Sequence, residues 1–172
     1  FGTGDFAVSL WYQRTDGGTY DLIGNGTPDS IGGFPESGFN LRVSNANASP
    51  TLQLFAGSTS VITANPSIGT ADNAAFQHVL FQRENDEFQL YVNNGTAVTN
   101  TPVPDIDLNT GLAFAIGARA KTNAGASDGT ADHMNGLMDE IFIFDNALTP
   151  EQIEGLFTSN TFPGIGGGGG GS

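Results

Sequence analysis

A long polar loop holds the residues whose types best suit ligand binding. Residues 123–133 are mostly small and polar, and they include Asn123, Asp128 and Asp132; Asn135 follows shortly after. Carboxylate and amide oxygens are ligands for Ca²⁺, and they also hydrogen-bond to the hydroxyls of sugars. The spacing does not match an EF-hand, which needs a regular series of acidic ligands closed by a Glu. The loop is therefore predicted to bind sugar hydroxyls or Ca²⁺, with a solvated loop as the alternative.

The carboxylates elsewhere do not have the spacing of a hydrolase. Retaining glycosidases hold two carboxylates about 5–5.5 Å apart, which on one strand requires alternate positions. Residues 84–87 are predicted to form a hairpin turn, while Asp139 and Glu140 are adjacent and would fall on opposite faces of a regular strand. There is no His-Glu-x-x-His motif and no phosphate-binding glycine loop followed by Lys. We therefore expect no enzymatic activity.

Charge and composition exclude several classes of partner. The 172 residues include 5 Lys+Arg against 18 Asp+Glu, which gives a formal net charge of −13. Binding to phosphate backbones or to anionic membrane surfaces needs basic residues, so nucleic acid and membrane partners are not expected. The chain has no Cys and 25 Gly, so disulfides are excluded and many turns are expected. Its length fits one folded domain.

Short runs of alternating apolar and polar residues predict the elements that must position these groups. This alternation is typical of half-buried β-strands, and turn residues separate the runs. Between two runs, Asn93-Asn94-Gly95 predicts a tight hairpin, because Asn and Gly tolerate positive φ. About ten short strands indicate an antiparallel sandwich or barrel. The clearest strands are residues 6–14, 39–43, 51–55, 76–83, 88–92, 112–118 and 137–144.

One helix and a tail are predicted at the end of the chain. Thr149 is placed as an N-cap, Pro150 as the first helical residue and Gln152 as the partner that completes a capping box. Apolar residues then follow at helical spacing. We expect one domain over residues 1–162, followed by a glycine-rich linker or tail at residues 163–172.

Three segments in order resemble the laminin-G-like family of the concanavalin A-like superfamily. Residues 4–14, GDFAVSLWYQR, are similar to the family's opening strand. Residues 76–95 resemble its central hairpin, although Phe76 stands where the family usually has Trp, and residues 134–153 resemble its closing strand and helix. This resemblance implies an all-β, antiparallel two-sheet jelly-roll sandwich with one short C-terminal helix.

The resemblance also implies a metal site. In family members with a metal, the Asp that matches Asp139 often helps to bind a structural Ca²⁺ near the start of the chain. Asp5 would join it if the terminal strands are neighbours, as they are in the family. The alternative is that Asp139 caps a turn or pairs with Arg14 or Lys121.

Aromatic residues and one histidine complete the candidates. His78 is expected in the core, hydrogen-bonded, and matches a structural histidine of the family. Trp11 is also expected in the core, with a sugar-stacking platform as the alternative. Phe34 lies in a glycine-rich loop, so we expect it to be exposed and to contact a ligand or partner.

These features together favour a non-enzymatic recognition or adhesion module that binds a glycan or a surface protein, with Ca²⁺ as a possible structural cofactor. We expect it to work in an extracellular, cell-surface or virion-surface setting, within a larger chain or assembly. The alternative is a structural building block of such an assembly, a filament or decoration protein without glycan binding. Because one fold hosts many functions, the fold does not choose between them.

Overall fold

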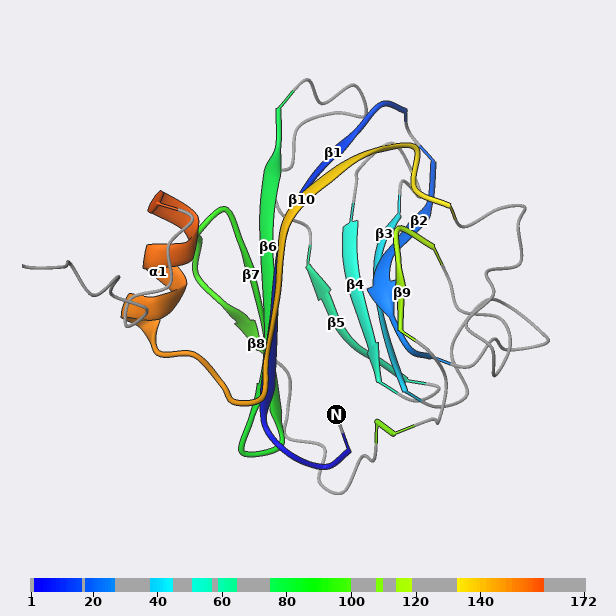
Figure 1. Cartoon of the computed structure of the whole chain (residues 1–172). Helices are drawn as coiled ribbons and strands as arrows, with labels where there is room; N and C mark the ends of the chain where they lie inside the picture. Colours follow the sequence, from blue (N-terminus) through cyan, green and yellow to red (C-terminus); the bar gives the residue numbers. More distant parts are fainter. Residues whose placement is uncertain are drawn as a thin grey trace, which may run out of the picture.

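Two antiparallel sheets face each other in the computed structural model, and a helix lies on the outer side of one of them (Figure 1). Within the described residues each sheet has five strands: sheet A has the order β10-β1-β6-β7-β8, and sheet B has the order β5-β4-β3-β2-β9. The fold is thus a sandwich rather than a barrel. The structure describes residues 2–16, 18–26, 38–44, 51–56, 59–64, 75–99, 108–109, 114–118 and 133–159.

Strand β1 (Phe6–Arg14) is the second strand of sheet A and pairs with strands that come much later in the chain. On its inner face Phe6, Val8 and Leu10 are buried in the space between the sheets, whereas Ala7 belongs to a second cluster under the helix. Both faces of β1 are therefore covered, which explains its nearly continuous burial. The other strands of sheet A are β6 (Gln77–Glu84), β7 (Glu87–Val92), β8 (Val98–Thr99) and β10 (Gly136–Phe144).

Two tight turns join β6, β7 and β8. Asn85 and Asp86 have φ values of 50° and 66°, and Asn93 and Asn94 have φ values of 49° and 55°. This pair of left-handed residues is typical of the hairpin turns whose twist matches that of the strands. Asn and Asp are the side chains that adopt this conformation most readily, so the predicted Asn93-Asn94-Gly95 hairpin is confirmed.

Sheet B contains a buried ion pair and one position that only glycine can fill. Arg42 Nε donates a hydrogen bond of 2.7 Å to Asp21 Oδ1 between adjacent strands. At Gly24, a Cβ atom would come within 2.4 Å of the Phe39 carbonyl oxygen, so any side chain there would push the strands apart. The strands are β2 (Tyr20–Gly24), β3 (Phe39–Ser44), β4 (Thr51–Ala56), β5 (Thr59–Ala64) and β9 (Ala115–Ile116).

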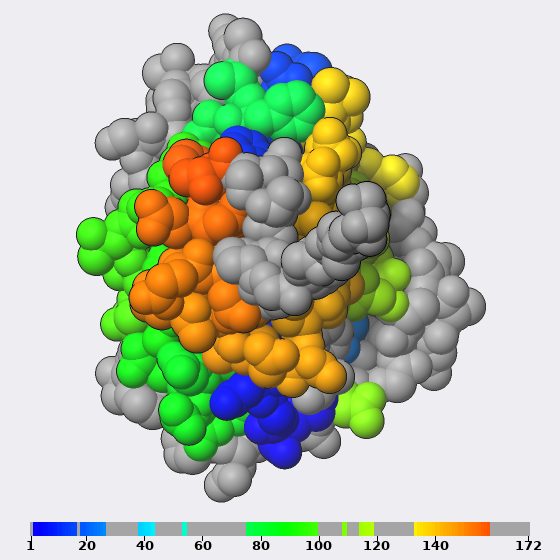
Figure 2. All heavy atoms as spheres, turned by 60° about the vertical axis from the view of Figure 1, so that its left-hand side comes forward, coloured from blue at the N-terminus to red at the C-terminus, as the bar shows by residue number. Residues whose placement is uncertain are grey.

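Helix α1 (Pro150–Ser159) begins with the predicted capping box. The Thr149 N–H donates to Gln152 Oε1 at 2.9 Å, and the Gln152 N–H donates to Thr149 Oγ1 at 3.4 Å. Ile153 and Leu156 are buried against the outer face of sheet A, where Leu80 belongs to the same cluster. Figure 2 shows the helix lying across this face, beside the closing strand. No helix in the described part of the chain is both long enough and apolar enough to span a membrane.

The sequence predicted most of these elements and missed two. The seven predicted strands are present, although the strand predicted at residues 112–118 is limited to β9 among the described residues. Strands β2 and β5 were not predicted, whereas β8 is the second strand of the predicted Asn93-Asn94-Gly95 hairpin. The all-β two-sheet architecture with one C-terminal helix is confirmed. The predicted tail at residues 163–172 lies outside the described residues.

Candidate functional site

The register between β1 and β10 places the two predicted metal ligands far apart. Asp139 lies opposite Trp11, whereas Asp5 precedes the first residue of β1. Six residues at about 3.3 Å each separate these levels by about 20 Å. The terminal strands are indeed neighbours, but Asp5 instead accepts a hydrogen bond of 3.0 Å from the Asn85 N–H in the β6–β7 turn. The expectation that Asp5 joins Asp139 at one cation was therefore wrong.

A β-bulge in β10 changes the surroundings of Asp139. Ser9 pairs with Phe142 and Trp11 pairs with Asp139, so Glu140 and Ile141 both lie opposite Leu10. Glu140 has a φ of 50°, the left-handed region that costs a residue with a side chain on the order of 1 kcal/mol or more. Bulges of this kind re-aim side chains and often lie beside binding sites.

Both acidic residues at the bulge line one hollow, which we call the Trp11 hollow. It is lined by Trp11, Phe76, Asp139 and Glu140 and has a volume of about 220 Å³. Both residues line this hollow, although two adjacent side chains of a regular strand would fall on opposite faces. The Asp139 carboxylate accepts a hydrogen bond of 2.9 Å from the Glu140 N–H, and neither carboxylate forms an ion pair with any residue that the structure describes.

Aromatic side chains fix the position of the Trp11 ring. Trp11 stacks on Phe157 of α1 with ring centroids 5.7 Å apart and an angle of 13° between the planes. His78 contacts both rings at centroid distances of 5.0 and 5.7 Å. Trp11 is partly buried rather than a core residue, while Phe76 is 39% exposed. The hollow thus combines an exposed ring with a ring that the helix holds in place.

His78 is the buried histidine that the sequence predicted. Its Nε2 shares a hydrogen bond of 2.8 Å with the Ser9 hydroxyl, and burial lowers its pKa to about 4. A Ser–His pair is the start of a nucleophilic site, but both residues are buried, and no described residue hydrogen-bonds to His78 Nδ1 to orient the ring. His78 therefore contacts β1 through Ser9 and α1 through Phe157.

Asn135 is held by the β1–β2 turn. Its amide donates a hydrogen bond of 2.8 Å to Asp16 Oδ2, and its backbone carbonyl accepts hydrogen bonds from the Thr15 N–H and hydroxyl. Asp16 also accepts hydrogen bonds from the Gly18 N–H and the Tyr20 hydroxyl. The Gly18 N–H and the Asn135 amide, with a smaller effect from the charge of Arg14, lower the pKa of Asp16. Asn135 thus anchors the start of β10 to this turn.

The other predicted ligand-binding residues, Asn123, Asp128, Asp132 and Phe34, lie outside the described residues. Within the described part of the chain, no three His, Asp or Glu side chains come together as a metal-binding group. Asp139 and Glu140 alone are a small fraction of the six to eight oxygens that Ca²⁺ takes. Arg14, one proposed partner of Asp139, is buried and forms no ion pair with it.

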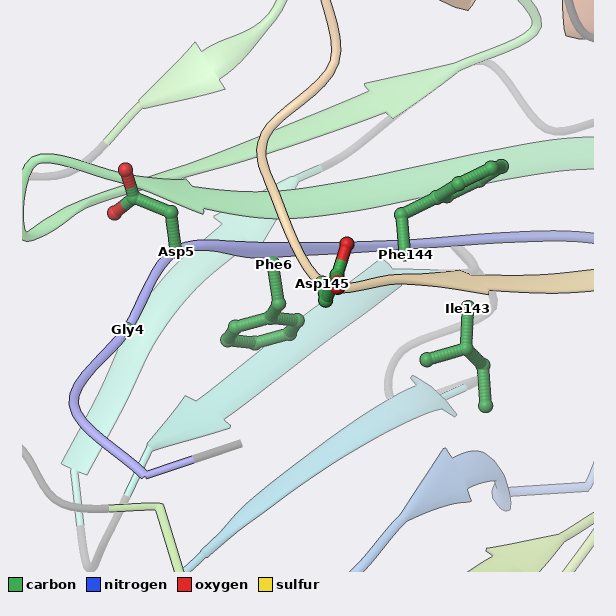
Figure 3. Close-up of a pocket in the computed structure, with 6 residues that line it drawn as sticks. All are labelled: Gly4, Asp5, Phe6, Ile143, Phe144 and Asp145. Carbon is green, nitrogen blue, oxygen red and sulfur yellow. The ribbon is translucent and has the colours of Figure 1, made fainter.

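A second hollow, of about 680 Å³, surrounds Asp5 at the other end of β10 (Figure 3). We call it the Asp5 hollow. In Figure 3, Phe6 and Ile143 point to one side of the β1–β10 pair, and Asp5 and Phe144 point to the other. Phe6 is almost fully buried, so it offers no ring face to a ligand. The other ring in its lining, Phe144, is partly buried and packs on Phe142. The Asp5 hollow thus has an aromatic ring beside acidic residues but no ring as exposed as Phe76 in the Trp11 hollow. Its lining residues are Gly4, Asp5, Phe6, Ile143, Phe144 and Asp145.

Sequence reasoning missed three residues that matter here: Glu140, Phe76 as a wall of a hollow, and Asp16. The Asp139-Glu140 pair was visible in the sequence, but the bulge depends on the register with β1. One feature of the sequence pointed to Phe76: it stands where similar sequences have Trp. Asp16 lies in a turn, and nothing in its spacing indicated that Asn135 would reach it across 119 positions.

Comparisons with known proteins agree with this architecture. The family model described as the concanavalin A-like lectin/glucanases superfamily matches residues 1–154. No curated protein sequence matches the chain.

Among solved structures, the heptameric SAP-like pentraxin of Limulus polyphemus is similar, with a TM-score of 0.71 and 15% identity over 91% of this chain and 71% of that chain. The sialidase CBM40 of Ruminococcus gnavus, bound to α2,3-sialyllactose, has a TM-score of 0.63 and 12% identity over 91% and 84% of the two chains. Domain 4 of the arabinanase AbnA from Geobacillus stearothermophilus, in complex with arabinotriose, has a TM-score of 0.59 and 19% identity over 91% and 68%. At these identities the likeness shows the fold.

Proposed function

Because this chain belongs to the concanavalin A-like lectin/glucanases superfamily, and because one hollow combines aromatic and acidic side chains, we propose that it is a non-enzymatic, extracellular glycan-binding module. The observation that carries the proposal is the composition of the Trp11 hollow. Aromatic rings cover the apolar face of a sugar, and carboxylates accept hydrogen bonds from its hydroxyls. Glycan ligands in the structures of CBM40 and of arabinanase domain 4 support this choice.

The size and the rigidity of the hollow fit a small part of a glycan. A volume of about 220 Å³ is below the roughly 300–1,000 Å³ of pockets for drug-sized ligands, so one terminal sugar ring is the natural occupant. Trp11 is held by the stack on Phe157, which limits the entropy lost when a ligand orders the site. Binding in such a shallow site is expected to be weak for one module and stronger when several modules act together.

A glycan array probed with the wild-type chain and with Phe76→Ala tests the proposal. Phe76 is exposed, so its truncation is expected to remove ring contact while leaving the fold unchanged, which circular dichroism verifies. Ile116→Ala, at an apolar residue of sheet B that is 50% exposed, is the matched control. We expect Phe76→Ala to lose the array signal and Ile116→Ala to keep it. Wild-type protein that binds no glycan, or a Phe76→Ala variant that binds normally, would refute the assignment of this site.

Calcium stays a proposal for the loop at residues 123–133 rather than for the pair of Asp139 and Asp5. A cation that binds only the folded state raises its stability. If the loop binds Ca²⁺, chelator should lower the melting temperature of the wild-type chain. It should lower that of Asp139→Ala by the same amount, because Asp139 is then not a ligand. A melting temperature that does not respond to chelator contradicts a structural calcium ion anywhere in the chain.

A second candidate function is a building block of a surface or virion assembly. Strand β10 is at the edge of sheet A among the described strands, and it exposes 56% of Leu137 and 49% of Ile143. Exposed apolar residues on an edge strand favour contact with another chain. Sedimentation velocity at increasing protein concentration separates the two functions: concentration-dependent assembly without glycan binding supports this candidate and contradicts the first.

A further inference from the structure

The Trp11 hollow has a charge that restricts which glycans it can bind. Asp139 and Glu140 are its only lining residues with charge among those described, and both have negative charge. No described arginine reaches this surface: Arg14, Arg42 and Arg83 are all buried, with exposed fractions of 2%, 8% and 0%.

The same imbalance extends over the described surface. Arg42 is paired with Asp21, and Arg83 is paired with Asp86. By contrast, many exposed carboxylates form no ion pair with any residue in the described part of the chain: Asp5, Glu84, Asp139, Asp145, Glu151 and Glu154. A surface with one sign of charge attracts ligands of the opposite sign and repels those of its own sign. An anionic sugar would meet repulsion both at a distance and inside the hollow.

We propose that the preferred ligand is a glycan with free amino groups, such as a chain of 2-amino sugars, and that acidic glycans are rejected. This inference rests on the proposed glycan-binding function and narrows it to one class of ligand. An ammonium group is attracted to an aromatic face and forms ion pairs with carboxylates. The Trp11 hollow offers both partners in one place, whereas a neutral sugar would use only the rings and the hydrogen bonds.

The backbone geometry of the bulge also supports a ligand with amino groups. Without the bulge, Glu140 would point away from the face that holds Asp139. Its left-handed backbone is an unfavourable conformation for Glu, and it occurs where two adjacent acidic residues line one hollow together with two aromatic residues.

Two oligosaccharides with the same sugar backbone, one with free amino groups and one with N-acetyl groups, provide the test. A tetramer of β-1,4-linked glucosamine and the N-acetylated tetramer are titrated calorimetrically, at a pH where both the amines and the carboxylates are ionised. We expect the amine form to bind about tenfold more tightly, since a cation–π contact together with exposed ion pairs has about this combined effect. Added salt should reduce the difference.

Variants separate the hollow from the general negative charge of the protein. Asp139→Asn and Glu140→Gln keep the shape of each side chain, and each should reduce the preference for the amine form several-fold. Asp145→Asn removes an exposed carboxylate of the Asp5 hollow and is the matched control, which should leave the preference unchanged. An equal effect of all three variants would show attraction by net charge alone and would overturn the inference.

The possible results distinguish this inference from the function on which it rests. If the acetylated tetramer binds as well as the amine form, or if an acidic glycan such as sialyllactose binds better than either, the charge selection is wrong while glycan binding stands. If no oligosaccharide binds, both the inference and the proposed function fail.

Discussion

Acidification should weaken the packing of α1 on sheet A through His78. Burial lowers the pKa of His78 from 6.5 to about 4. Above pH 6.5 the imidazole is neutral in both the folded and the unfolded chain. As the pH falls below 6.5, the unfolded chain takes up the proton first, so the free energy of unfolding decreases until the pH reaches about 4. A pKa difference of this size corresponds to about 3 kcal/mol.

Urea denaturation between pH 7 and pH 4 measures this loss. Trp11 is the only tryptophan in the chain and contacts His78, so its fluorescence reports on the packing of the helix. His78→Gln can keep a hydrogen bond to Ser9 without titrating. It should be less stable than wild type at pH 7, because the ring contact with Phe157 is lost, but its stability should depend less on pH.

The comparison removes other acid-sensitive groups from the result. Asp16 and Glu151 have lowered pKa values, so their contributions are also lost as the pH falls. Both are present in wild type and in His78→Gln, and only the difference between the two proteins is assigned to His78. We expect that difference to be about 3 kcal/mol. Equal losses in the two proteins, or an NMR titration of His78 in the folded protein near its ordinary pKa, would refute the reasoning.

Three further substitutions test the packing and the charges of the fold. Leu156→Ala should decrease the free energy of unfolding by about 3 kcal/mol, because it leaves a cavity under α1; exposed Glu154→Ala is the control, and urea denaturation is the measurement. Thr149→Ala removes the N-cap and should decrease stability by about 1 kcal/mol, seen as a lower melting temperature. Asp21→Asn removes the charge that pairs with buried Arg42 and should cost about 3–5 kcal/mol in calorimetry; a cost below about 1 kcal/mol would show that this ion pair is not essential to the fold.

The sequence was most informative where local rules determine structure. Alternation gave β1 with its observed bounds, and the capping residues gave the start of α1 at Pro150. Strand β2 was missed because its five residues are buried on both faces and include the buried Asp21, so the alternation that reveals a strand is absent. Such a strand is recognisable only when its neighbours are known.

The candidate site was harder to predict because it depends on register. Asp139 was singled out from the sequence, but its partners were not. Asp5 was chosen from the order of the strands, whereas the register places it at the other end of β1. Glu140 was set aside because adjacent residues alternate in a regular strand, and one bulge removed that premise.

The topology of sheet A also has a consequence for how the chain folds. Strand β1 is made first, but both of its partners come later: Phe6 pairs with Arg83, and Ala7 pairs with Phe144, which is 144 − 7 = 137 positions away. Such distant pairing makes folding slow, whereas the β6–β7–β8 hairpins form from near neighbours. During synthesis, both edges of β1 therefore stay unpaired until β6 and β10 have been made. An apolar strand with unpaired edges is prone to aggregation. Fragments that end before β6 should be insoluble, and the growing chain should depend on chaperones until β10 has been synthesised.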